Sequence, residues 1–95
     1  MNNLDEMWKR LEQHQIFADQ RRYGREWKRM CVERTEDAAE AAADSAWHAG
    51  AAVHPVGSVY ATNAANAVRV TIAGEEDAAD WAMIAIASIK KAEGE

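Results

Sequence analysis

The chain has 95 residues, of which 48% are hydrophobic and 28% are charged, and it contains a single cysteine, Cys31. These values predict one small folded domain, residues 1–95, and exclude a disordered chain and a disulfide-stabilised secreted fold. The longest apolar stretch, WAMIAIASI, is too short to span a membrane. The net charge of −5 is uneven, because residues 1–34 carry eight Lys and Arg against six Asp and Glu, whereas residues 35–95 carry three against ten. We therefore expect a cytoplasmic protein with one basic and one acidic region.

Two helices are predicted in the basic part of the chain. The first begins with Asn3 as its N-cap, and its helical pattern breaks near residues 17–19. Its apolar positions are Leu4, Met7, Trp8 and Leu11. The second covers about residues 20–34 and separates an apolar face from a basic one. The basic face carries Arg21, Arg22, Arg25, Lys28 and Arg29.

The third predicted helix lies in the stretch RTEDAAEAAADSAWHAG, with Thr35 as its N-cap and Gly50 near its end. One of its faces is made almost entirely of alanine, and we expect it to pack closely in the core with Trp47 as an anchor. The alanine face holds Ala38, Ala39, Ala42, Ala46 and Ala49. The opposite, polar face holds Asp37, Glu40, Asp44 and His48.

Two further helices are predicted in the acidic half. The fourth begins at Ser58 as its cap and stops at Gly74. Its apolar face contains Tyr60, Ala61, Ala64, Ala65, Val68 and Ile72. The last, within EEDAADWAMIAIASIKKAEGE, starts with acids and ends with Lys90 and Lys91, as the helix dipole favours. It is apolar around most of its circumference, which predicts a central position in the fold.

The pattern as a whole predicts an all-α fold, a compact bundle of four to five short helices. An α+β alternative remains, with a small antiparallel sheet from about residues 25–34 and 58–73, because VRVTIA alternates as a strand would. Alanine is depleted in strands, and ATNAANA therefore favours the helix. Alanine also buries little area, so the four tryptophans must supply much of the core, and a homo-oligomer would compensate for a lean one.

The polar face of the third helix raises the question of a metal site. Glu40, Asp44 and His48 are spaced at i, i+4 and i+8, so the set extends over two helical turns and cannot converge on one ion without His14 or His54 from elsewhere. We therefore interpret Asp37, Glu40, Asp44 and His48 as an acidic surface, and we expect no bound metal or cofactor.

The other candidate sites give little support for nucleic-acid binding or catalysis. The five basic residues between 21 and 29 could contact phosphates, but a pI of about 5.1 is wrong for a general nucleic-acid binder. Cys31 would be reactive only with a histidine base beside it, and its position next to Met30 favours a buried thiol. Since no phosphate-binding loop, CxxC or HExxH motif occurs either, we expect that the protein is not an enzyme.

In size, acidity and alanine content, the chain resembles small inhibitors encoded by phages and mobile elements, such as anti-CRISPR proteins. The resemblance implies a non-catalytic interaction protein that blocks a surface of a partner protein or nucleic-acid-binding complex in the host cytoplasm, through its basic or its acidic residues. One alternative is a nucleic-acid-binding regulator that uses residues 21–29. A second is a helical toxin-immunity protein, which stretches such as SVYATNAANA resemble.

Overall fold

The computed structural model describes residues 2–14, 22–50, 55–74 and 76–94, and side chains within these ranges except at 22–23, 49–50 and 55–57. The described residues form five helices and no strand. The helices are α1 (Asn3–Gln13), α2 (Arg22–Glu33), α3 (Glu36–Gly50), α4 (Pro55–Ile72) and α5 (Ala78–Ala92). The prediction of an all-α bundle is confirmed. The sheet alternative is wrong, because both of its segments lie in helices, and in α4 four helix-favouring alanines outweigh the alternating β-branched residues.

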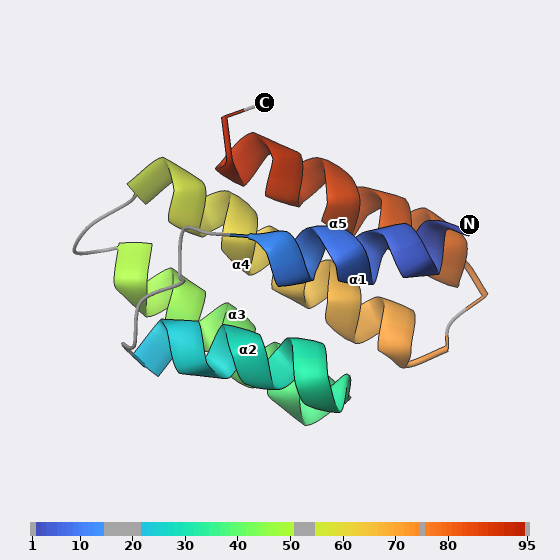
Figure 1. Ribbon diagram of the computed structural model, residues 1–95, viewed down its shortest axis with the longest axis horizontal. Helices are drawn as coiled ribbons and strands as arrows, with labels where there is room; N and C mark the ends of the chain where they lie inside the picture. Colours follow the sequence, from blue (N-terminus) through green and yellow to red (C-terminus); the bar gives the residue numbers. More distant parts are fainter. Residues whose placement is uncertain (1, 15–21, 51–54, 75, 95) are drawn as a thin grey trace.

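The helices form a closed arrangement in which each successive pair is in contact and α1 packs against both α2 and α5 (Figure 1). Figure 1 shows α1 crossing the front of the molecule between α2 and α5, while α3 and α4 lie behind. The molecule measures 36 × 27 × 18 Å. Helices α3 and α4 pack against each other, and the candidate site lies where they meet.

The core has a bulky half and an alanine half. The bulky half comes from α1, α2 and α5, and its buried side chains are Met7, Trp8, Leu11, Trp27, Met30, Cys31, Ile86 and Ile89. In α3 and α4 most of the buried side chains are alanines, and the others are Ser45, Ser58, Val68 and Thr71. The small side chains let these helices approach closely. The predicted alanine face of α3 is thus confirmed at its described positions, whereas Ala49 lies outside the described side chains.

Two helix boundaries follow the predicted caps. The Thr35 Oγ1 accepts a hydrogen bond from the Ala38 N–H at 3.2 Å, as expected of an N-cap. Gly74, with a φ of +75°, ends α4 in the left-handed conformation that glycine adopts without strain. At α1 the prediction of Asn3 is wrong by one residue, because the cap is Asn2, whose Oδ1 accepts from the Asp5 N–H at 2.8 Å. The predicted break near residues 17–19 lies outside the described residues.

Two predictions about position are wrong. Ser58 is not the cap of α4, because the helix begins at Pro55 and the Ser58 hydroxyl donates a hydrogen bond to the Ala46 carbonyl of α3. The last helix is not central either, since Met83 and Ile84 are 55% and 45% exposed. Its apolar circumference therefore leaves apolar side chains in contact with solvent. No helix among the described residues is both long enough and apolar enough to cross a membrane.

Candidate functional site: an acidic groove between α3 and α4

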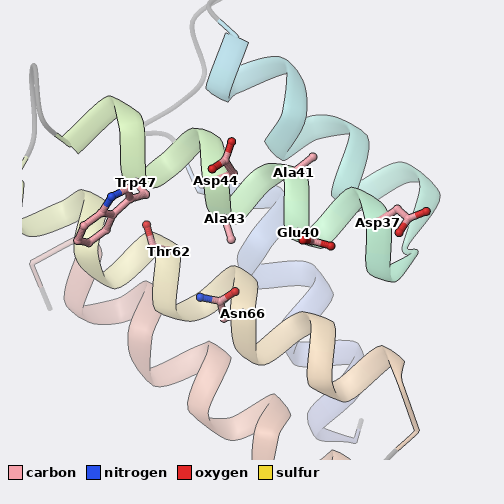
Figure 2. Close-up of a pocket in the computed structure, with 8 residues that line it drawn as sticks. All are labelled: Asp37, Glu40, Ala41, Ala43, Asp44, Trp47, Thr62 and Asn66. Atoms are coloured by element: carbon pink, nitrogen blue, oxygen red, sulfur yellow. The ribbon is translucent and has the colours of Figure 1, made fainter.

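A groove of about 510 Å³ runs along the outer side of α3 where this helix meets α4 (Figure 2). Its lining residues are Asp37, Glu40, Ala41, Ala43, Asp44, Trp47, Thr62 and Asn66. Figure 2 shows Thr62 and Asn66 projecting from α4 toward α3, and the Trp47 ring extending from α3 toward α4. The groove thus combines carboxylates, small side chains, an aromatic ring and two neutral polar groups.

The acidic rim comes from a single face of α3. Asp37, Glu40 and Asp44 are exposed, and their spacing of three and four residues aligns them along the helix. The opposite face is buried alanine, so burial of that face fixes which way the carboxylates point. Within the described residues neither Asp37 nor Glu40 has an ion-pair partner, and their charges therefore act on the groove without local neutralisation.

His48 belongs to the same face but does not line the groove. Its Nδ1 lies 2.7 Å from the Asp44 carbonyl oxygen and 3.5 Å from the Asp44 Oδ1, so the imidazole is turned back along α3. The structure therefore brings three of the four predicted acidic-face residues into the groove and leaves His48 beside it. In the described ranges no group of three or more His, Cys, Asp or Glu side chains could hold a metal ion.

Trp47 was predicted to anchor the core, and this prediction is wrong because the residue is 61% exposed. Its position follows from helix geometry, since Glu40, Asp44 and Trp47 at i, i+4 and i+7 share one face. The spacing that aligns the carboxylates also places the Trp47 indole on their face. The exposure of Trp47 could therefore have been predicted from the sequence. An exposed tryptophan on the same helix face as Glu40 and Asp44 is the most distinctive feature of the groove.

The basic face of α2 is only partly available to a partner. Arg21 lies outside the described residues, and nothing is described of the Arg22 side chain. Arg25 and Lys28 are exposed. Arg29 sits between two glutamates of its own helix, with its Nε 2.9 Å from Glu33 and its Nη1 3.4 Å from Glu26.

The ion pair with Glu33 is the main cause of a raised pKa at Arg29. The two glutamates offset the charge of Arg29, and the sequence reading that grouped the cations on one face did not account for the acids between them.

Cys31 is buried on the inner side of α2. Burial, with a smaller contribution from the charge of Glu12, raises the pKa of its thiol to about 12, whereas the nearby Arg34 acts in the opposite direction. The side chain therefore stays a protonated thiol at neutral pH, as expected of a packing residue, and a thiolate nucleophile is disfavoured.

No protein-family model matches the chain, and no significant similarity to a curated protein or to a solved structure was found.

Proposed function

We propose that this protein is a small, non-catalytic binding protein whose α3–α4 groove receives a basic segment of a partner protein. The observation that carries the proposal is the position of Trp47, an exposed indole at the rim of a groove lined by three carboxylates. Tryptophan is among the side chains most enriched at the energetic centres of protein interfaces, and the negative charges of Asp37, Glu40 and Asp44 favour a cationic ligand.

Each part of the groove has a role in such a complex. An arginine or lysine of the partner can stack on the Trp47 ring, a contact worth about 0.5–1 kcal/mol at an exposed site. Asp44 and Glu40 lie on the same face and supply the opposite charge. The side chains of Thr62 and Asn66 offer hydrogen bonds from the α4 side, and Ala41 and Ala43 leave room for the backbone of the partner to approach.

A binding protein of this kind would act as an inhibitor. Basic surfaces on cytoplasmic proteins commonly contact nucleic acids, and an acidic protein that covers such a surface competes with the phosphates. This is the mode of action implied by the resemblance to phage and mobile-element inhibitors. A toxin-immunity role would use the groove in the same way against a different partner, and identification of that partner separates the two.

The proposal is tested by quantitative affinity capture from the native host with groove variants as baits. We expect Trp47→Ala and Asp44→Lys to lose one defined partner that the unmodified protein retains, and this partner to bind the purified protein with an affinity that falls as salt rises. Glu76→Lys is the matched control, since it makes the same change in charge at an exposed position outside the groove. A partner that binds all three variants equally would contradict the proposal.

The nucleic-acid alternative has its own test, because it depends on α2 and not on the groove. It requires salt-sensitive binding of duplex DNA in a gel-shift assay, and loss of that binding when Arg25 and Lys28 are changed to Glu. The ion pairs that engage Arg29 favour the opposite outcome, no measurable DNA binding by the purified protein.

A further inference from the structure

The outer face of α5 exposes apolar side chains that no other described helix covers. Met83 and Ile84 are neighbouring large apolar residues, and both are exposed to solvent, which is unusual on the surface of a monomer. Ala87 is also exposed, one helical turn further on. Leu4 is another exposed large apolar side chain, and it lies on α1, which packs beside α5 (Figure 1). This apolar ridge, defined by Met83, Ile84 and Ala87, is bounded by charges at both ends of the same face.

The charges at the two ends are of opposite sign. Asp80 is exposed one turn before Ile84, and Lys91 is exposed one turn after Ala87. The positions 80, 84, 87 and 91 recur at helical spacing, so they form one continuous stripe along the outside of α5. Read in either direction, the stripe consists of a charge, two apolar positions and the opposite charge.

We propose that the outer face of α5 binds the same face of a second copy of this chain, with the two α5 helices antiparallel. Reversing the stripe about the midpoint between residues 85 and 86 places Asp80 opposite the partner's Lys91. The same operation places Ile84 opposite the partner's Ala87. A two-fold axis at this midpoint therefore buries both ridges and satisfies both charges at once, which is what an isologous dimer requires.

Three further features support a second copy as the occupant. The antiparallel arrangement places the positive end of each helix dipole beside the negative end of the other, which is favourable. The small side chain of Ala87 accepts the larger Ile84 of the partner, so the ridge packs without a clash. The Lys91 Nζ already lies 5.7 Å from the centre of the Tyr60 ring, a cation–π contact that holds the ammonium at the edge of this face.

The dimer is expected to be weak. One helix from each copy buries less than the roughly 800 Å² per partner of a standard interface, and we expect a dissociation constant of about micromolar or weaker. The α5 face lies apart from the α3–α4 groove, so the dimer presents two copies of that groove. Failure of the dimer and failure of the proposed groove function are therefore separate outcomes.

The first experiment measures the oligomeric state by sedimentation equilibrium over a range of protein concentrations. We expect a monomer–dimer equilibrium that Met83→Glu and Ile84→Glu each weaken by about tenfold or more. The matched control is Val32→Glu, because Val32 is a 77% exposed apolar residue on α2. Circular dichroism verifies that each variant is folded. A chain that stays monomeric throughout, or a dimer that Val32→Glu disrupts as strongly, overturns the proposal.

The second experiment tests the antiparallel register by charge reversal. Asp80→Lys and Lys91→Glu should each weaken the homodimer, because like charges then face each other at both ends. Combining the two substitutions in one chain should restore the dimer. Mixing the two single variants should give a heterodimer that is more stable than either variant alone, since every charge again faces its opposite. A mixture no more stable than its components overturns the register.

Discussion

His14 connects three helices at the end of α1. Its Nδ1 lies 3.1 Å from the Glu93 Oε1 just after α5, and its ring packs 5.3 Å from the Trp27 ring of α2. The Trp27 indole in turn donates a 2.9 Å hydrogen bond to the Leu11 carbonyl of α1. His14 is 5% exposed, and this burial lowers the pKa of its imidazole, with the carboxylate of Glu93 acting in the opposite direction.

The lowered pKa predicts a loss of stability at acid pH. The unfolded chain protonates His14 near its ordinary pKa of 6.5 while the folded chain keeps it neutral. The free energy of unfolding should therefore fall as the pH drops through 6.5 toward the folded pKa, by at most about 1.4 kcal/mol per pH unit. Urea unfolding between about pH 7 and pH 5.5 measures this slope.

The variant His14→Asn should flatten that slope while it lowers stability at neutral pH. His48→Asn is the comparison variant, since it makes the same substitution at an imidazole that is exposed and not buried. An equal slope in the unmodified protein and in His14→Asn would show that the burial of this imidazole does not govern the acid response.

The individual helices show which structural features the local sequence pattern can predict. Helical spacing and alanine content placed all five helices, and they identified the buried faces of α3 and α4, because these features depend only on neighbours along the chain. The exposure of Met83 and Ile84 could not be predicted in the same way. A helix that is apolar around its circumference can lie at the centre of a fold or at an uncovered surface, and only the packing of the other helices decides between them.

Ser58 is a residue whose sequence context predicts a helix cap but whose side chain makes a contact between two helices. A serine before an apolar helical segment is typical of an N-cap, yet the proline at position 55 starts the helix one turn earlier. Ser58 then faces α3, and its hydroxyl donates to the Ala46 carbonyl from a position that is only 1% exposed. The side chain thus serves contact between helices.

The two roles of Ser58 predict different responses to substitution. As a buried contact residue, Ser58→Asp should reduce the free energy of unfolding by about 3 kcal/mol or more, because it buries an unpaired charge. An N-cap serine would accept aspartate with little change. Ser58→Ala should cost about 1 kcal/mol. Thermal unfolding followed by circular dichroism distinguishes these outcomes, and unchanged stability in Ser58→Asp would restore the cap interpretation.

At the scale of the whole molecule, the charge asymmetry along the chain becomes an asymmetry between surfaces. The excess cations of the first 34 residues are partly engaged, since Arg34 pairs with Glu12 at 2.8 Å and lies over the Trp8 ring, and Arg29 pairs within α2. The carboxylates of α3 instead collect along the groove. We therefore expect the acidic groove to attract the basic groups of an approaching partner.

This attraction can be measured with Trp47 as the probe. Trp47 is the most exposed of the four tryptophans, so collisional quenchers in solution reach its ring most readily. At low ionic strength the carboxylates should concentrate Cs⁺ and repel iodide, and Cs⁺ should quench the Trp47 emission more efficiently, relative to its quenching of free tryptophan, by a factor of about two or more. Trp47→Phe should remove most of the quenchable emission.

The Cs⁺ preference should disappear in the double variant Glu40→Gln/Asp44→Asn and persist in Glu6→Gln/Glu76→Gln, which removes the same charge from exposed positions outside the groove. Added salt should reduce it in the unmodified protein, because the Debye length falls below about 10 Å above 0.1 M. If both double variants lose the preference equally, the net charge of the molecule and not the groove sets the field. A basic segment would then be drawn to the protein without being directed to Trp47.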